Sequence, residues 1–318
     1  MISILGVGKA YAKNEISKEL LLSLDPANAS LIEANYQKPV YSTLGVDYIL
    51  SSNNNNLKYA FENCTETTTD LAYQASLEAI QRAGINKDQI GLVLGDCATP
   101  VETIPGESQR LANKLGIKVP AYDMLCGSCA ALGFIDSISN WKQDRIPDYI
   151  LCVSSNSPTQ RLNYSKGQER FYFSDAAGAM LISSRLPGKL KVKEAKVFNG
   201  QSKACGLQID LFGYMQVDLS TITENYSDFR RKRDEYIKNF DIAPMLLSAH
   251  IPPAWRGYRQ ETLDLHDLRE EKNANSLGAG VFCALSECWD SIGIHDILAL
   301  SVFSLETFSG GLIVLGNK

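Results

Sequence analysis

Residues 122–134 read as a short strand, a cluster of small residues and a helical run, in the order Tyr-Asp-Met-Leu-Cys-Gly-Ser-Cys-Ala-Ala-Leu-Gly-Phe. The cluster holds three candidate nucleophiles, Cys126, Ser128 and Cys129. A side chain on a sharp strand-to-helix turn is exposed, and the first free N–H groups of the helix favour its anion. The segment therefore predicts an α/β protein with a nucleophile elbow. Small residues at such a turn also simply let a helix pack closely on a strand, so the elbow needs partners elsewhere.

Two polar residues far along the chain supply such partners. His250 ends the apolar, strand-like run 245–250, and Asn275 lies in a glycine-rich loop before the helical run 281–285. A histidine at the carboxyl edge of a strand lies where open α/β sheets keep their sites. We therefore expect a nucleophile, a histidine and an asparagine on three separate turns. The other two histidines, His266 and His295, lie beside acidic residues and are expected on the surface.

Several segments, in a fixed order along nearly the whole chain, resemble the thiolase-fold condensing enzymes, in particular the ketoacyl-acyl-carrier-protein synthase III branch. They are residues 2–11, 71–85, 88–94, 103–105, 122–134, 173–182, 245–250 and 275–280. The resemblance implies a five-layer α-β-α-β-α sandwich of two similar halves, 1–185 and 186–318, with the active site where they meet. It also implies that the nucleophile takes an acyl group from a thioester, and that His250 and Asn275 help a malonyl thioester to decarboxylate and condense with it.

The nucleophile is the first point at which the chain departs from this family. Ungapped counting from the neighbouring strands puts the family's catalytic cysteine on Ser128, whereas Cys129 requires a shift of one residue and Cys126 matches only a thiolase-like alignment. A serine hydroxyl cannot rely on helix polarity alone and needs a general base within hydrogen-bond reach. His250 is the expected base, and the elbow amides are the expected oxyanion hole.

Two further departures concern the substrate. Where the family has a glycine run near the C-terminus, residues 302–311 include Phe303 and Leu305, which we expect to reshape the pocket. Thr43 stands in place of an arginine that binds the coenzyme A nucleotide, which weakens the case for free coenzyme A as donor. We therefore expect an acyl carrier protein as donor, with Arg256 and Arg259 meeting its acidic surface. The basic run 230–233 lies among acids and reads as a solvated helix face, with carrier binding as the alternative.

Composition narrows the function classes. A net charge of −5 and a pI near 5.4 argue against nucleic-acid binding. We find no apolar run long enough to span a membrane and no signal-like start, so a cytoplasmic protein without membrane contact is expected. The eight cysteines read as free thiols, and the isolated C-x-x-C pair does not support a metal site. No cofactor is expected.

The sequence is compatible with two function classes. The first is an acyltransferase that forms its product by decarboxylative condensation or by O- or N-acylation. The second is a catalytically silent partner of an active relative. In either case the resemblance implies a dimer, with residues 103–105 reaching across to the other subunit so that Ile104 limits the length of the bound acyl chain.

Overall fold

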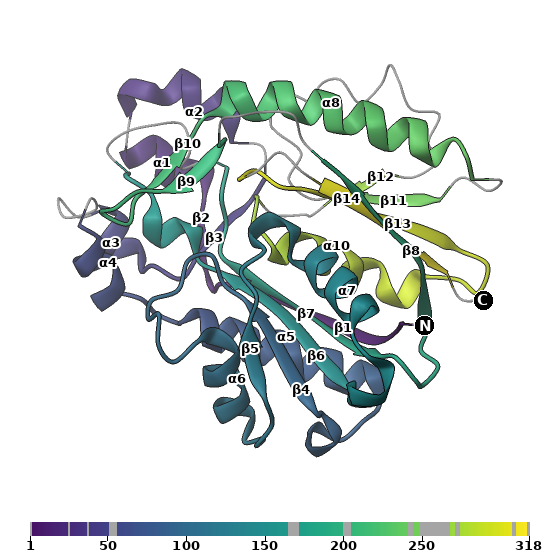
Figure 1. Cartoon of the computed structure of the whole chain (residues 1–318). Helices are drawn as coiled ribbons and strands as arrows, with labels where there is room; N and C mark the ends of the chain where they lie inside the picture. Colours follow the sequence, from purple (N-terminus) through teal and green to yellow (C-terminus); the bar gives the residue numbers. More distant parts are fainter. Residues whose placement is uncertain are drawn as a thin grey trace.

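A mixed sheet of ten strands runs through the part of the chain that the structure describes (Figure 1). The structure is a computed structural model, and it describes residues 2–24, 26–36, 38–50, 56–164, 172–199, 205–240, 244–248, 268–270, 274–306 and 310–316. The first half of the chain contributes β1 (Ser3–Tyr11), β4 (Leu92–Asp96), β5 (Ala121–Asp123), β6 (Ile150–Asn156) and β7 (Ala176–Ser183). The second half contributes β8 (Leu190–Phe198), β11 (Met245–Ser248), β12 (Leu268–Glu270), β13 (Ile297–Phe303) and β14 (Gly310–Gly316).

The two sets of five strands repeat one topology. The order across the sheet is β12-β11-β13-β14-β8-β1-β7-β6-β4-β5, which reads the same from either end toward the middle. In each set the second strand in chain order lies parallel to the third and fourth, and the fifth lies antiparallel to the fourth and the first. The sets join where β1 and β8 pair antiparallel, with Ser3 opposite Lys191 and Ile4 opposite Leu190.

Helices divide the molecule into five layers (Figure 1). The outer face of the first strand set is covered by α5 (Thr68–Ala83) and α6 (Glu107–Leu115), and that of the second set by α8 (Leu219–Ile237). Between the sets lie α7 (Ala130–Asn140) and α10 (Ala279–Cys288), whose apolar side chains share one core with strands of both halves. The α-β-α-β-α order predicted from the sequence is thereby confirmed.

Local sequence explains how these layers pack. Every residue of β6 and β7 is buried, as expected for strands with helices on both faces. Helix α5 begins with a capping box between Thr67 and Asp70 and ends at Gly84, whose φ of 66° is left-handed. A β-carbon on Gly8 of β1 would lie 2.0 Å from the Ala75 carbonyl oxygen, so glycine lets α5 lie directly on the sheet.

Shorter elements form a second apolar cluster, to which Phe173 and Phe303, the last residue of β13, also belong. The elements are α1 (Lys18–Leu24), α2 (Ala29–Asn35), α3 (Val46–Leu50), α4 (Leu57–Glu62), β2 (Asn14–Ile16), β3 (Val40–Ser42), β9 (Leu207–Ile209) and β10 (Met215–Val217). Single 3₁₀ turns lie at Pro26–Asn28, Lys87–Gln89, Gly127–Cys129, Gln143–Arg145, Pro158–Arg161 and Trp289–Ser291. Among the described helices, none combines the length and apolar character that crossing a bilayer requires.

Candidate active site

The elbow lies at the carboxyl edge of three parallel strands. Strand β4 ends at Asp96, β6 carries Ser154 near its end, and β5 leads into the 3₁₀ turn Gly127–Cys129 that opens α7. Gly127 has a φ of 53°, a left-handed conformation that glycine adopts without strain. Loops that follow parallel strands at one edge bring their side chains together. This edge therefore gathers the polar groups of the first half around Ser128.

Asp96 fixes the shape of the elbow through hydrogen bonds to its backbone. The side chain is fully buried, and its Oδ1 accepts hydrogen bonds from the backbone N–H groups of Cys126, at 2.8 Å, and Gly127, at 2.9 Å. Its Oδ2 accepts a third hydrogen bond from Ser154 Oγ at 2.8 Å. Burial raises the pKa of Asp96 to about 7, and the nearby charge of Glu306 adds to the shift. Asp96 is thus a carboxyl that titrates near neutrality and holds the turn through its backbone.

Ser128 is buried and hydrogen-bonded to a carboxylate from the other half of the chain. Its Oγ donates to Glu306 Oε1 at 3.0 Å, and its backbone N–H donates to the same oxygen at 3.2 Å. Ser304 Oγ donates to the other carboxylate oxygen, Oε2, at 2.9 Å. A β-carbon on Gly127 would lie 2.6 Å from Glu306 Oε1, so the glycine makes room for this carboxylate. The sequence prediction missed Glu306, although it lies within the segment that replaces the family's glycine run.

The elbow amides are all engaged, which bears on the predicted oxyanion hole. The N–H groups of Cys126 and Gly127 bind Asp96, that of Ser128 binds Glu306, and that of Cys129 donates to the Cys126 carbonyl. The first two amides thus share the buried Asp96 of β4, whereas the Ser128 amide is held by a side chain from the other half of the chain. An oxyanion hole at this turn therefore requires the Ser128 amide to exchange Glu306 for a substrate oxygen.

The two thiols beside Ser128 lie in surroundings that disfavour thiolates. Burial, together with the charge of Asp96, raises the pKa of Cys126 to about 11. Burial and the neighbouring charge of Glu306 raise the pKa of Cys129 well above its ordinary value. Reactive cysteines need the opposite, an electropositive setting that lowers the thiol pKa. Among the three candidates, the surroundings thus favour Ser128 as the nucleophile.

The Asn275 loop packs directly on the elbow. A β-carbon on Gly278 would lie 2.5 Å from the Gly127 carbonyl oxygen and 2.8 Å from Asp96 Oδ2. Asn275 Oδ1 accepts a hydrogen bond from the Leu277 N–H at 2.8 Å, and Leu277 is a buried residue with a left-handed φ of 53°. Non-glycine residues hold that conformation at a cost of about 1–3 kcal/mol, often at functional sites. Asn275 therefore stabilises a strained turn that contacts the nucleophile segment.

The other predicted site residues divide into three groups. His250, Arg256 and Arg259 lie outside the described residues. Phe303 and Leu305 are buried in the second apolar cluster. The centroid of the Phe303 ring lies 5.3 Å from that of Tyr226 and 5.2 Å from that of Phe229, both on α8. Ile104 is 87% exposed on this chain. The structure thus brings Ser128, the Asn275 loop and Glu306 together.

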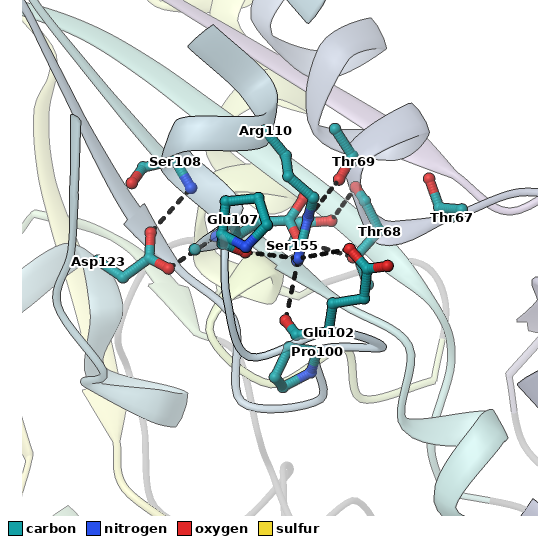
Figure 2. Close-up of polar contacts among 12 residues, drawn as sticks. Thr67, Thr68, Thr69, Pro100, Glu102, Glu107, Ser108, Arg110, Asp123 and Ser155 are labelled. Atoms are coloured by element: carbon teal, nitrogen blue, oxygen red, sulfur yellow. Dashed lines mark hydrogen bonds and ion pairs between the residues drawn. The ribbon is translucent and has the colours of Figure 1, made fainter. Parts of the chain in front are cut away.

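Arg110 of α6 holds the loop that carries Ile104, as Figure 2 shows. Its Nη1 donates to the carbonyl oxygens of Glu102 at 2.9 Å and Pro105 at 2.7 Å, and its Nη2 donates to the buried Glu107 carboxylate at 2.7 Å. The Asp123 carboxylate accepts from the first two backbone N–H groups of α6 at 2.7 and 2.8 Å. These contacts tie the loop to the end of β5, next to the elbow.

Thr43, interpreted as a lost coenzyme A contact, and the basic run 230–233, interpreted as a solvated helix face, have partners within the chain. Thr43 is fully buried, and both its N–H and its Oγ1 donate to Asp175 Oδ2 at 2.7 Å, so it presents no phosphate-binding group at a surface. In the basic run, Arg231 pairs with Asp228 and Glu235, and Lys232 pairs with Asp228. Arg233 departs from the predicted solvated face, because it is buried against Ser301 and Asp234. Within the described residues, no cluster of His, Cys, Asp and Glu suits a metal ion.

Comparisons with known proteins place the fold. No protein-family model matches the chain. A β-ketoacyl-[acyl-carrier-protein] synthase III of Campylobacter fetus is 34% identical over 124 residues, which are 37% of this chain and 37% of the relative. The match thus spans well under half the length of that curated relative.

Solved structures cover the whole chain at low identity. A tetronic acid condensing enzyme matches with a TM-score of 0.82 and 16% identity, over 99% of this chain and all of its own. The 3-oxoacyl-[acyl-carrier-protein] synthase III of Aquifex aeolicus matches with a TM-score of 0.80 and 16% identity, again over 99% and 100%. The fold is therefore the thiolase fold predicted from the sequence.

Proposed function

Because the chain has the thiolase fold and is similar over part of its length to β-ketoacyl-[acyl-carrier-protein] synthase III, we propose that it is an acyl-transferring enzyme of this kind. Ser128 takes an acyl group from a thioester and passes it to an acceptor, in fatty-acid-like or polyketide biosynthesis. The observation that carries the proposal is the Ser128 hydroxyl, which lies on the elbow with a carboxylate oxygen 3.0 Å from its Oγ. A serine nucleophile gives an oxygen ester, so the second step is O- or N-acylation, or a condensation with altered priming.

His250 and Asn275 serve the transfer step in this proposal. Asn275 donates a hydrogen bond to the carbonyl oxygen of the thioester or acceptor, from a turn that packs on the elbow. His250 assists proton transfer in this step, as the resemblance to the condensing enzymes implies. It follows β11, whose last residue, Ser248, lies opposite Ser301 of β13, and β13 leads to Glu306.

The donor in this proposal is a carrier-protein thioester rather than free coenzyme A. Position 43, where the related enzymes place a phosphate-binding arginine, is a buried threonine bonded to Asp175. A lost charge-assisted hydrogen bond costs about 1.5–3 kcal/mol, or roughly tenfold to a hundredfold in affinity. With Arg256 and Arg259 as the cationic contacts for an acidic carrier, the preference for the carrier should weaken as salt screens surface charge. Equal rates with both donors at low salt would contradict this assignment.

A homodimer is the assembly in this proposal. β5 is one of the two edge strands of the described sheet, and exposed apolar side chains lie on it or near its end, with Leu125 74% and Ile104 87% exposed. Exposed sheet edges and large apolar side chains favour pairing with another chain. Ile104 would then reach the partner's acyl pocket and limit chain length. Sedimentation that shows only monomer at micromolar concentration would remove both claims.

Intact-protein mass spectrometry tests the central step. The protein is incubated with a panel of acyl-carrier thioesters, and the added mass identifies the acyl group. Peptide mapping should place the adduct on Ser128. Ser128→Ala should abolish the adduct, whereas Cys129→Ala should leave it. The reverse pattern would make this a cysteine enzyme and would move the nucleophile to Cys129.

A silent partner subunit is the second candidate, and one observation favours it. Ser128 is fully buried, and its N–H and Oγ are both occupied by Glu306. A subunit whose nucleophile is permanently covered would form no adduct with any donor. The absence of adducts across the full panel, from a folded protein, would decide for the silent partner.

A further inference from the structure

A serine on an elbow needs a group that takes its proton, and the structure supplies one that the sequence pattern did not predict. We propose that Glu306, rather than the expected His250, is the general base of Ser128, so that the nucleophile works through a serine–glutamate pair that joins the two halves of the fold. This inference rests on the proposed function, since it assigns the base for the same serine. It adds a catalytic residue in the segment where the related enzymes have a glycine run.

The geometry of the pair fits proton transfer. The Oγ to Oε1 distance of 3.0 Å lies within the range for a general base and its proton donor. Ser304 fixes the second carboxylate oxygen at 2.9 Å, so the first is held toward the elbow. Ser304 follows β13 directly and Glu306 comes two residues later, and β13 is a buried strand in the middle of the second strand set. The carboxylate is therefore held at both oxygens, by Ser304 on its own turn and by Ser128 on the elbow.

Asp96, the other carboxyl beside the elbow, is engaged in a different way. Its two oxygens accept from Cys126, Gly127 and Ser154, so it binds the backbone of the turn and not the nucleophile. We therefore assign it a positioning role. Glu306 is the carboxylate whose oxygen contacts the reacting atom.

The reaction through this pair balances without a further reagent. As Ser128 Oγ attacks the thioester carbonyl carbon, its proton passes to Glu306 Oε1 and a C–O bond forms. When the tetrahedral intermediate collapses, the C–S bond breaks and the proton passes from Glu306 to the leaving sulfur, which departs as a thiol. In the second step the acceptor O–H or N–H gives its proton to Glu306 as it attacks the Ser128 ester, and Glu306 returns that proton to Ser128 Oγ as the ester C–O bond breaks. As the Oε1 contact with the Ser128 N–H is released, that amide becomes free for the developing oxyanion.

An alkyl fluorophosphonate measures the activation of Ser128 without any acyl donor. The probe reacts with an activated serine hydroxyl, releases fluoride and leaves a stable phosphonate ester that mass spectrometry detects. Glu306→Gln keeps the size of the side chain and removes the base, so the labelling rate should fall by about 10²–10⁴-fold, the usual contribution of a general base. Glu224→Gln, which changes an exposed carboxylate on α8, should label at the rate of the unchanged protein. If Glu306 merely covers the serine, its replacement should leave the labelling rate unchanged or raise it. Labelling of Glu306→Gln within about threefold of the unchanged protein, or faster, would therefore overturn the inference.

A second variant keeps the test decisive if Glu306→Gln does not fold. Glu306→Ala leaves room for a small carboxylate, so added formate should raise its labelling rate at least severalfold, whereas chloride at the same ionic strength should not. No increase with formate in a folded variant would contradict the base role. Failure of the proposed function has a separate signature. Labelling that persists in Ser128→Ala removes Ser128 as nucleophile, whereas normal labelling without any carrier-derived adduct leaves the base in place and removes the proposed donor.

Discussion

A β-carbon on Gly278 would lie 2.5 Å from the carbonyl oxygen of Gly127, closer than side-chain carbons approach oxygen in proteins. The same atom would lie 2.5 Å from Ser154 Oγ and 2.8 Å from Asp96 Oδ2. All three neighbours are backbone or short, hydrogen-bonded side chains that cannot turn aside. The Asn275 loop and the nucleophile elbow therefore share a contact that only glycine permits.

Gly278→Ala should consequently disturb the elbow. We expect a loss of about 1–3 kcal/mol in the free energy of unfolding, the usual cost of overpacking, together with slower adduct formation at Ser128. Gly45→Ala is the matched control, because its β-carbon would meet nothing closer than 3.8 Å and its stability should change by less than about 1 kcal/mol. Urea titrations of both variants measure the difference. Equal stability of the two would show that the loop can move away from the elbow.

Asp96 should give the protein a pH-dependent stability. Its pKa is about 7 in the folded chain and 3.8 in an unfolded reference, so the folded state binds the proton more tightly. Stability from this group is fully present below about pH 4 and is lost as the pH rises through 7, on the order of 4 kcal/mol in all. Asp96→Asn should flatten this slope, and the remaining slope includes Asp175, whose pKa is also raised, to about 6, by burial.

Urea unfolding at pH values from 5 to 8 compares Asp96→Asn with the unchanged protein. Asp136→Asn is the control, because Asp136 is exposed on α7 and its replacement should leave the slope as it was. An unchanged slope in Asp96→Asn would mean that Asp96 ionises normally despite its burial.

The thiols of the elbow should be unreactive in the folded protein. The pKa of Cys126 rises from 9.0 to about 11, which lowers its thiolate fraction near neutral pH by about a hundredfold, and the pKa of Cys129 rises further. Iodoacetamide at pH 7.5 should therefore modify the exposed Cys205 well before either elbow thiol. Peptide mapping over time measures the three rates, and urea-unfolded protein, in which all three should react alike, is the control. Rapid native modification of Cys129 would point back to a cysteine nucleophile.

The elbow was predictable because its signal is local, whereas the five layers were predicted from the resemblance of segments along the chain to a known family. The strand, the small residues and the helix lie within residues 122–134, and a run of buried apolar residues such as β6 can be recognised without knowledge of its neighbours. Asp96 also left a signal, a single acid at the end of the apolar run Leu92–Asp96, which the sequence reasoning did not use.

Glu306 could not be predicted in the same way. It is 178 residues from Ser128 in sequence, and only the packing of the two halves brings their side chains together. Thr43 shows the same limit from the other side. Its alignment with an arginine that binds coenzyme A suggests a lost substrate contact. Its burial against Asp175, by contrast, comes from contacts between residues 132 positions apart in the sequence.

Removal of the Arg110 side chain should destabilise the fold. Glu107 is buried, with 3% of its surface exposed, and Arg110 is its ion-pair partner at 2.7 Å (Figure 2). Removing one partner of a buried pair leaves an uncompensated charge and costs about 3–5 kcal/mol, so Arg110→Ala should destabilise the fold by roughly that amount. The loop that carries Ile104 loses its hydrogen bonds to Arg110 in the same variant, so the proposed dimer should weaken as well.

A double variant separates the buried charge from the loop contacts. In Arg110→Ala with Glu107→Gln the buried group is neutral, so much of the lost stability should return, while the weakened dimer should persist because the loop still lacks its anchor. Arg145→Ala, which removes an exposed arginine elsewhere, should stay within about 0.5 kcal/mol of the unchanged protein. Urea unfolding and sedimentation on the same samples measure the two effects. If the double variant is no more stable than Arg110→Ala, the cost lies in the loop contacts, and the ion pair with Glu107 contributes little.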